Sequence, residues 1–364
     1  MNQNPHLRAS KTAVLLLNLG TPSAPRPKAV RAYLKDFLSD PRVVEIPRFI
    51  WWFILNGIIL PIRSSASAKK YAIIWLPKLG SPLMHYSRLQ AKDLGEKFAN
   101  EGHTVLVDLA MRYGDPSTQS VLEGLKAQGM ERLLLLPLYP QYSATTTASS
   151  FDEVFRVLKS WRDQPELRLV KHYHDNSAYI AALRDQVLAS WDSESRPDFA
   201  KGDRFVMAFH GLPKRNLMKG DPYHCECLKT GRLLGESLGL EPGQYLVTFQ
   251  SRFGKTEWLK PYTASTIEKL AKEGCQRIDI FCPGFPADCL ETLEEIAMEA
   301  REIFLEHGGK DYRYILCLNS NPKWIDALSA IAHHHLQGWA LGVESEPELA
   351  KRHERAQLAE RNQG

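Results

Sequence analysis

The sequence predicts an α/β protein built from two similar lobes, each with a parallel sheet flanked by helices. The strand-like runs are continuously apolar, which is typical of parallel strands buried on both faces. Amphipathic stretches with helical spacing alternate with these runs, as in doubly wound folds. The chain has 364 residues, more than the ~250–300 residues that a single hydrophobic core usually serves.

Short runs rich in leucine or β-branched residues, each followed by turn residues, are expected to form the strands. These strands are expected at residues 13–19, 105–109, 133–136, 205–209, 246–249, 278–282 and 314–318. The helices between them are expected at residues 89–101, 117–129, 149–161, 178–190, 261–274 and 290–307. Ligands of such folds bind outside the carboxyl ends of the strands, so side chains at those ends are the first candidates for a site.

A repeated pattern suggests that the two lobes are related. Pro137-Leu-Tyr-Pro140 ends one strand and Pro283-Gly-Phe-Pro286 ends another, and a helix with acidic residues follows each. Chance is the alternative, because Pro and Gly commonly follow strands. The polar stretch 192–203 is the expected boundary. The predicted units are an N-terminal lobe at 11–195, a C-terminal lobe at 203–332 and a charged tail at 333–364.

Composition excludes several classes of function. The 46 basic and 42 acidic residues leave a net charge of +4, too small an excess to indicate nucleic acid as a partner. The 6 cysteines lie in the C-terminal half and are expected to be reduced thiols of a cytoplasmic protein. No secretory pattern precedes the first strand. No apolar stretch reaches the ~20 residues of a membrane span; the nearest, residues 49–62, is called the lip segment below.

Common catalytic motifs are absent from the sequence. There is no G-x-G-x-x-G after the first strand, no G-x-x-x-x-G-K-[ST], no H-E-x-x-H and no G-x-S-x-G, so the standard nucleotide, zinc-protease and serine-hydrolase classes are not indicated. His224-Cys-Glu-Cys227 offers three soft ligands but has no paired C-x-x-C elsewhere. A solvent-facing turn is therefore favoured there over a metal site.

His210 is the first candidate for chemistry, because it directly follows an expected buried strand and precedes Gly211-Leu-Pro213. A histidine with an ordinary pKa near ~6.5 can bind a metal or accept a proton at neutral pH. Position alone does not separate this role from that of a histidine that caps a turn.

The second candidate is a group of acidic residues at the start of the expected helix 290–307. Asp288, Glu291 and Glu295 are three and four positions apart, so a helix would place them on one face. Three carboxylates in this arrangement suit a divalent cation or a relay for protons. The alternative is that acidic residues in a first turn interact with the helix dipole, which explains Glu295 least.

A set of motifs distributed from about residue 11 to residue 331 resembles ferrochelatase, most closely the proteobacterial type. They are Leu17-Asn-Leu-Gly-Thr-Pro22, Gly80-Ser-Pro-Leu83, Met111-Arg-Tyr113, Leu138-Tyr-Pro-Gln-Tyr-Ser143, Phe209-His-Gly-Leu-Pro213, Phe249-Gln-Ser-Arg-Phe-Gly254 and Asp288-Cys-Leu-Glu-Thr292. The resemblance implies the chelatase fold, with an active-site cleft between the lobes. It also implies a lyase that inserts Fe(II) into protoporphyrin IX, forming protohaem and releasing two protons.

The resemblance assigns roles to individual residues. His210 and Glu291 correspond to the catalytic and metal-binding pair, and Asp288 and Glu295 to a path for metal or protons. Residues at porphyrin-binding positions are Arg63, Ser81, Arg112, Tyr113 and Trp258. An ordinary surface ion pair for Arg112 and a place in the core for Trp258 are the alternatives.

The resemblance also implies that the lip segment surrounds the mouth of the site, where peripheral contact with a membrane would help a poorly soluble porphyrin to enter. A helix buried in the N-terminal lobe is the alternative. A [2Fe–2S] cluster is not expected, because Ala144 stands where animal enzymes have a cysteine and no cysteine follows Cys317. A coproporphyrin ferrochelatase or other tetrapyrrole metal chelatase, and a non-catalytic tetrapyrrole or metal carrier, are the competing functions.

Overall fold

A computed structural model of the chain describes residues 9–252, 254, 256–342 and 346–361, and it contains two parallel four-stranded sheets. The first sheet has the order β2-β1-β3-β4 and the second has the order β6-β5-β7-β8, so the two sheets share one topology. The strands are β1 (Lys11–Gly20), β2 (Leu106–Tyr113), β3 (Met130–Pro137), β4 (Glu166–Leu169), β5 (Arg204–His210), β6 (Tyr245–Gln250), β7 (Arg277–Phe281) and β8 (Asp311–Ile315). The predicted fold class is confirmed.

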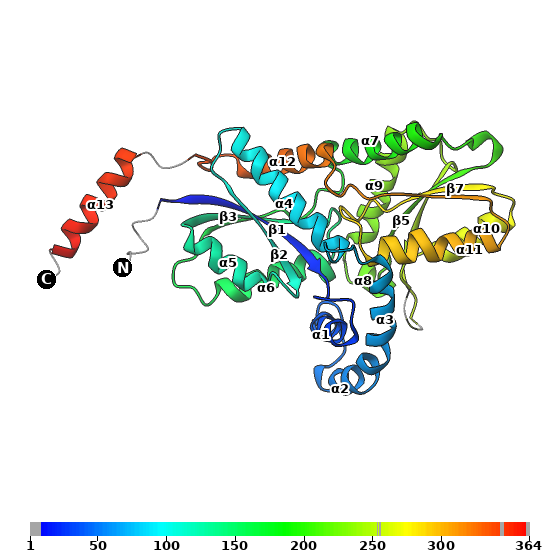
Figure 1. Ribbon diagram of the computed structural model, residues 1–364, viewed down its shortest axis with the longest axis horizontal. Helices are drawn as coiled ribbons and strands as arrows, with labels where there is room; N and C mark the ends of the chain where they lie inside the picture. The colour runs from blue at the N-terminus through cyan, green and yellow to red at the C-terminus, as the bar shows by residue number, and fades with distance from the viewer. Residues whose placement is uncertain (1–8, 253, 255, 343–345, 362–364) are drawn as a thin grey trace.

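Helices cover both faces of each sheet (Figure 1). In the first half of the chain they are α1 (Pro27–Leu38), α2 (Arg48–Ile54), the π-helix η2 (Leu55–Ile59), α3 (Leu60–Ile74), α4 (Pro82–Asn100), α5 (Thr118–Ala127), the π-helix η3 (Ala144–Ala148), α6 (Ser149–Leu158) and α7 (Ser177–Glu194). In the second half they are the 3₁₀ turn η4 (Phe199–Lys201), α8 (Lys214–Met218), α9 (Tyr223–Ser237), α10 (Thr263–Lys272), the π-helix η5 (Glu291–Glu299), α11 (Ala300–Glu306), α12 (Pro322–Leu336) and α13 (Glu346–Arg361).

The central strands are buried on both faces because their sequences carry almost no polar residue. In β1 the run Ala13–Leu17 is at most 1% exposed, and Leu16 lies between Leu109 of β2 and Leu136 of β3. The strand ends at Gly20, whose φ of 115° suits glycine. A Cβ at Gly20 would lie 1.8 Å from the carbonyl oxygen of Tyr113, so no other residue fits there.

Two helices pack against the sheet of the other half of the chain. Helix α7 follows the first sheet in sequence, yet its Trp191 Nε1 donates a hydrogen bond of 2.8 Å to Asp279 in β7. Helix α12 follows the second sheet, yet it contacts α4 and β3 of the first (Figure 1). The predicted boundary at residue 333 falls inside α12. The division into lobes at 11–195 and 203–332 stays a prediction.

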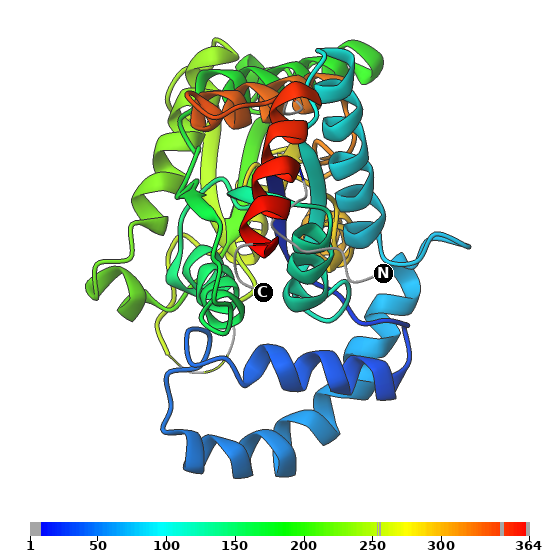
Figure 2. The same cartoon turned by 90° about the vertical axis from the view of Figure 1, so that its left-hand side faces the viewer.

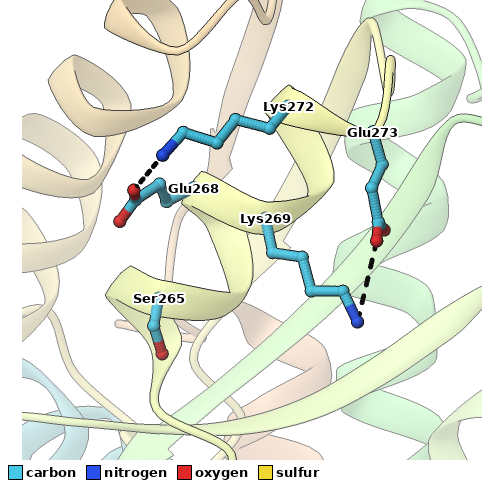
Figure 3. A pocket seen from close by; sticks show the side chains of 5 residues that line it. All are labelled: Ser265, Glu268, Lys269, Lys272 and Glu273. Atoms are coloured by element: carbon cyan, nitrogen blue, oxygen red, sulfur yellow. Dashed lines mark hydrogen bonds and ion pairs between the residues drawn. The ribbon is translucent and has the colours of Figure 1, made fainter.

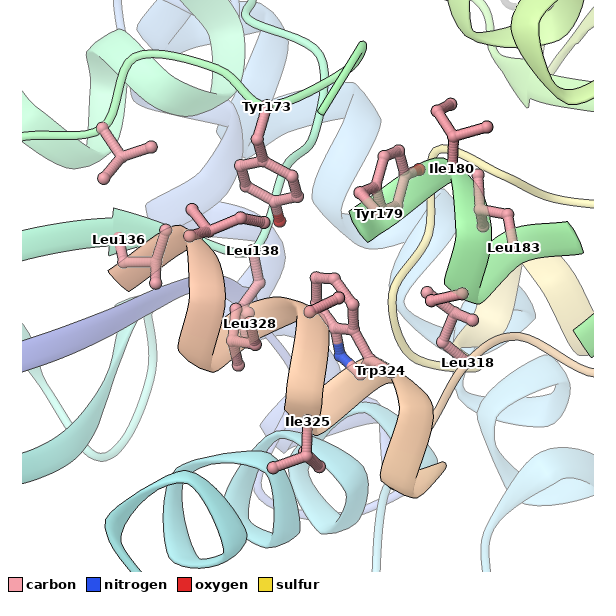
Figure 4. Close-up of a cluster of buried hydrophobic side chains, with 14 of the residues drawn as sticks. Leu136, Leu138, Tyr173, Tyr179, Ile180, Leu183, Leu318, Trp324, Ile325 and Leu328 are labelled. Carbon is pink, nitrogen blue, oxygen red and sulfur yellow. The ribbon is translucent and has the colours of Figure 1, made fainter. Parts of the chain in front are cut away.

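One continuous cluster of buried side chains joins the two halves. It contains Leu136 of β3, Tyr179 of α7, Phe209 of β5 and Trp324 of α12, each at most 1% exposed. Figure 4 shows Trp324 with Tyr179 on one side and Leu136 and Leu138, at the end of β3, on the other. The ring of Trp324 contacts the rings of both Tyr173 and Tyr179. The halves therefore share a core.

The lip segment is part of a continuous helical stretch, Arg48–Ile74, that lies beside α1 at the lower edge of the molecule (Figure 2). Its most apolar 18-residue window has a mean hydropathy of 1.3 and is 17% buried. By length and composition alone, the stretch is long enough to cross a membrane, which corrects the expectation from the sequence. Leu55 and Leu60 face inward and are at most 2% exposed, whereas Phe49 is 76% exposed. A fully buried helix is thus excluded.

Candidate active site at the carboxyl ends of the second sheet

His210 is the last residue of β5, and its half-buried ring lies at the carboxyl end of the sheet. The amide of Gly211 donates a hydrogen bond of 2.9 Å to the Gln250 carbonyl of β6. Glycine permits this close approach, because a Cβ would lie 2.4 Å from that carbonyl oxygen. Phe285 lies edge-on to the imidazole, at 6.5 Å between ring centroids. Burial lowers the pKa of His210, and the charge of Glu291 acts in the opposite direction. The imidazole is therefore neutral at pH 7.

Glu291 is the first residue of the π-helix η5 and lies near enough to His210 for its charge to act on the pKa of the imidazole. Gln250, the last residue of β6, donates a hydrogen bond of 2.9 Å from its side chain to the Glu291 carbonyl. Two buried tyrosines of the first half, Tyr33 and Tyr71, also lie near this carboxylate. Burial raises the pKa of both tyrosines well above the ordinary value, and the charge of Glu291 adds to the effect. Both hydroxyls therefore stay protonated.

Glu295 lies one turn further along η5. Ser251 donates two hydrogen bonds to its carboxylate, one of 2.6 Å from the backbone amide and one of 2.5 Å from the hydroxyl. Burial outweighs these bonds and raises the pKa of Glu295 to about 7, and the charge of Glu291 contributes in the same direction. This carboxyl can therefore bind or release a proton near neutral pH.

Asp288 does not share the helix face of the other two carboxylates, because it precedes η5 and is 1% exposed. Its oxygens accept hydrogen bonds from Tyr314 (2.5 Å), Asn319 (2.6 Å) and Thr292 (3.0 Å). The expectation that the three carboxylates would line one helical face is therefore wrong for Asp288. These contacts position the loop before η5, and the proposed path role of Asp288 stays a prediction.

Arg112 and Tyr113, at the end of β2, converge on one buried carboxylate. Asp40 accepts hydrogen bonds from Arg112 Nη2 (2.6 Å), Tyr113 (2.8 Å) and Ser149 (2.5 Å). Although burial alone would raise it, hydrogen bonds from Ser149 and Tyr113 and the charge of Arg112 lower the pKa of Asp40. The guanidinium also lies 4.6 Å from the centre of the Tyr113 ring. Arg112 therefore forms an ion pair with a buried carboxylate, not the surface ion pair considered as its alternative role.

The three other expected porphyrin-binding residues come from three separate places. Arg63 is half-buried on α3, and burial lowers its pKa. Ser81 is 4% exposed and precedes the first turn of α4. Trp258 is half-buried and lies against Gly211, where an added Cβ would be 3.3 Å from the indole ring. Trp258 is therefore beside His210.

A shallow hollow lies away from these residues, on the exposed surface of α10 (Figure 3). Its lysines are already paired, Lys272 with Glu268 at 2.5 Å and Lys269 with Glu273 at 3.7 Å. This surface has no feature that would select a ligand. The expected cleft between the lobes stays a prediction.

Comparison with known proteins identifies the family. The sequence model of the ferrochelatase family matches residues 11–336. The chain is 58% identical over 354 residues to a ferrochelatase of Herminiimonas arsenicoxydans, covering 97% of this chain and 94% of the relative. It is 61% identical over 334 residues to a ferrochelatase of Janthinobacterium sp. (strain Marseille), covering 92% of this chain and 89% of the relative.

The chain belongs to the ferrochelatase family. The resemblance inferred from its motifs is confirmed.

Two solved structures share the fold of this ferrochelatase at low sequence identity. SirB from Bacillus subtilis with Fe³⁺ aligns with a TM-score of 0.51 at 14% identity, over 90% of this chain and 96% of SirB. The sirohydrochlorin chelatase SirB from Bacillus subtilis subspecies spizizenii, in complex with cobalt, aligns with a TM-score of 0.51 at 10% identity, over 90% and 97%. These likenesses support the chelatase fold.

Several residues of the candidate site were not assigned from the sequence. Gln250 and Ser251 directly follow a predicted strand inside one of the quoted motifs, so their place at a strand end was an available signal. Tyr33 and Tyr71 carried no such signal, because only the folded chain brings them to Glu291. Asp40 likewise meets Arg112 only through the packing of α1 against β2.

Proposed function

We propose that this ferrochelatase inserts Fe(II) into protoporphyrin IX to form protohaem, with release of two protons. The family and the relatives at 58–61% identity support this activity. The observation that carries the proposal is the pairing of a neutral, half-buried imidazole, His210, with a nearby carboxylate, Glu291. The reaction needs a group that can accept a proton and a pair of ligands that can release the metal.

The chemistry assigns separate tasks to these groups. Two pyrrole N–H protons leave as the iron enters, so the ring needs a base at its centre. Neutral His210 has a free lone pair to accept the first proton or to bind iron. An imidazole with one carboxylate holds a ferrous ion only moderately, which suits a site that passes its metal on. Glu295, with a pKa of about 7, would take up the proton that leaves and pass it to solvent.

The roles of the five porphyrin-binding residues are also proposed from the family resemblance. Trp258 would stack beside the ring near His210, and Arg63 and Ser81 would bind the propionates. Arg112 and Tyr113 would line the pocket. Asp40 already balances the charge of Arg112. We therefore expect Arg112 to orient Tyr113 and Ser149 more than to bind a propionate directly.

An anaerobic assay tests the function. The protein is incubated with Fe(II) and either protoporphyrin IX or coproporphyrin III, and the visible spectrum reports metal insertion. Multiple turnovers with protoporphyrin support the proposal, whereas turnover with coproporphyrin alone indicates the competing chelatase. Binding without turnover indicates a carrier. His210→Ala should abolish insertion but keep porphyrin binding, and near-normal turnover of this variant would remove His210 from the mechanism.

We propose that the enzyme uses iron only as a substrate and has no [2Fe–2S] cluster. Such a cluster generally takes four converging thiolates. Cys282 and Cys317 are buried beside strands, and Cys225 and Cys227 lie on α9 rather than on the expected loop, one exposed and one buried. Stoichiometric acid-labile sulfide in anaerobically purified protein would contradict the proposal.

We propose that the exposed face of the lip segment contacts a membrane surface. Phe49, Trp52 and Phe53 are 55–76% exposed and pack edge to face against one another, and an aromatic cluster of this kind favours the bilayer interface. Phe49→Ser with Phe53→Ser should reduce co-sedimentation with anionic vesicles several-fold. Phe155→Ser, on the exposed face of α6, is the matched control. Equal binding by both variants would exclude the contact.

A further inference from the structure

A group of metal-ligand side chains lies outside the candidate active site, where the loop after β4 meets the first turn of α9. His172 and His174 come from the loop, and Glu226 comes from α9. The ligand atoms of these three side chains lie within 4.8 Å of one another. The expected solvent-facing turn at residues 224–227 is instead the start of a helix, and it places Glu226 inward at 6% exposure.

Both histidines direct the same ring nitrogen toward one carboxylate. His172 Nδ1 is 2.6 Å from one oxygen of Glu226, and His174 Nδ1 is 3.4 Å from the other. The two rings are 4.9 Å apart between centroids, at an angle of 63°. This arrangement brings two nitrogens and a carboxylate together around one point.

The Nδ1 atom of His174 forms no hydrogen bond to the described part of the protein. The side chain is 7% exposed, and this nitrogen is buried. Its contact with Glu226 has the distance of an ion pair but not the geometry of a hydrogen bond. Buried nitrogens normally have a partner, so an unsatisfied one directed at a carboxylate indicates a missing ligand.

The geometry points to a divalent metal site formed by His172, His174 and Glu226, suited to a borderline cation such as Zn²⁺ or Fe²⁺. Two imidazoles and a carboxylate are ligands that such cations accept, with a fourth position left for water. The site differs from the candidate active site in every residue, and the inference does not depend on the proposed function.

Binding requires only small changes. In the tautomer of His172 with its proton on Nε2, Nδ1 has a free lone pair and can bind the metal. Groups around the site would hold the ligands in place, as is usual at metal sites. Tyr142 donates its amide to Glu226 at 2.7 Å, and Asp175 lies 3.8 Å from Nε2 of His174.

The neighbouring charges do not exclude a cation. Lys229 is already paired with Asp175 at 2.5 Å, and the ammonium of Lys171 lies 5.0 Å from the centre of the Tyr142 ring. A bound ion would connect the loop after β4, which belongs to the first sheet, to α9, which packs on the second. We therefore expect the ion to stabilise the contact between the two halves rather than to take part in metal insertion.

Anaerobic equilibrium dialysis against Zn²⁺ and, separately, Co²⁺ tests the site in the full chain. His210→Ala is used as the background so that the candidate active site contributes little binding. This chain should retain one equivalent of metal, and adding His172→Gln should weaken its binding at least tenfold. His172 is 40% exposed, and circular dichroism and protoporphyrin binding check that the variant is folded. Zn²⁺ should also raise the Tm of the background chain but not that of the variant.

A second cluster of the same composition supplies the matched control. Glu101, His103 and His333 also bring ligand atoms within 4.8 Å, but on the surface, where His333 already contacts Glu101 at 2.7 Å. His333→Gln in the same background should still bind one equivalent of metal. The inference is overturned if the His172→Gln variant binds metal as tightly as the His210→Ala background. It is also overturned if His333→Gln, and not His172→Gln, removes the bound equivalent of metal. Failure of His210→Ala to stop haem formation would contradict the proposed mechanism but not this site.

Discussion

At the scale of single residues, two glutamates one helical turn apart have different surroundings. The carboxylate of Glu295 accepts two hydrogen bonds from Ser251, whereas Glu291 is connected to Gln250 only through its backbone carbonyl. The bond from Gln250 therefore does not engage the Glu291 carboxylate, whose charge acts on the pKa of His210. Ser251 holds Glu295 in place, and Glu295 would take up the proton once that proton has left the porphyrin.

Replacing each glutamate by glutamine should separate these roles. Glu291→Gln keeps size and hydrogen bonding but removes the charge, so turnover should fall by ~10²–10⁴-fold, the range of acid–base groups. Glu295→Gln should reduce turnover less, because Glu295 lies one turn further along η5 and its carboxylate is held by Ser251. Initial rates of haem formation at saturating substrates provide the measurement. Small and equal losses would mean that both acids serve only the helix dipole.

The raised pKa of Glu295 also predicts a pH dependence of stability. The ordinary pKa is 4.5 and the folded value is about 7, so between these values the folded state binds more protons than the unfolded state. The stability that Glu295 contributes is complete below pH 4.5 and is lost as the pH rises through 7. Urea denaturation at pH 5 and 7.5 should show a larger loss of unfolding free energy for the wild type than for Glu295→Gln. An equal loss in both would contradict the raised pKa.

The sequence singled out His210 because it ends a buried strand, and strand ends are ligand positions in α/β folds. The paired roles of His210 and Glu291 came from the family resemblance and stay predictions. The sequence was insufficient to place Asp288. Spacing placed Asp288 on the helix face, but the helix begins later, and three polar partners hold the carboxylate in the preceding loop. The interlobe partners of Glu291, such as Tyr71, depend on tertiary packing, which spacing does not encode.

At the scale of elements, the close approach of β5 and β6 behind His210 depends on one glycine. A Cβ at Gly211 would lie 2.4 Å from the carbonyl oxygen of Gln250. Gly211→Ala should therefore separate the two strand ends, lower stability by ~1–3 kcal/mol and reduce turnover by displacing His210. Denaturation and haem-formation rates measure the two effects.

Gly124, in the exposed part of α5, is the matched control for this change. Nothing lies within 4 Å of a Cβ added there. Gly124→Ala should stabilise the protein by ~0.5–1 kcal/mol through helix propensity and leave turnover unchanged. If Gly211→Ala behaved like Gly124→Ala, the approach of the two strands would not constrain the site.

Buried strands were predicted from the sequence more accurately than exposed ones. Runs such as Leu133–Leu136 identified the central strands, because a strand buried on both faces is continuously apolar. The edge strand β4 was not predicted, since its sequence Glu166-Leu-Arg-Leu169 is mostly exposed and half charged. Strand β8 was expected at 314–318 but ends at Ile315, and Leu316 beyond it is 53% exposed. Apolar character alone did not locate that boundary.

At the scale of the whole molecule, the exchange of helices α7 and α12 makes the two sheets depend on each other. Each helix follows one sheet in sequence and packs on the other. A metal at His172, His174 and Glu226 would add a second connection between the same halves. The candidate site also takes residues from both halves, with His210 and Glu291 from one and Tyr33 and Tyr71 from the other. Its geometry therefore requires that the halves stay docked.

Trp324 is the residue that tests this dependence. It is fully buried in the core that joins the halves and contacts both Tyr173 and Tyr179. Trp324→Ala should lower the free energy of unfolding by ~3–5 kcal/mol and leave a single transition, monitored by both circular dichroism and tyrosine fluorescence. Trp52→Ala, at a side chain 58% exposed, should change stability by less than ~0.5 kcal/mol. Two separate transitions in the Trp324 variant would show that each half folds alone and that the shared core does not couple them.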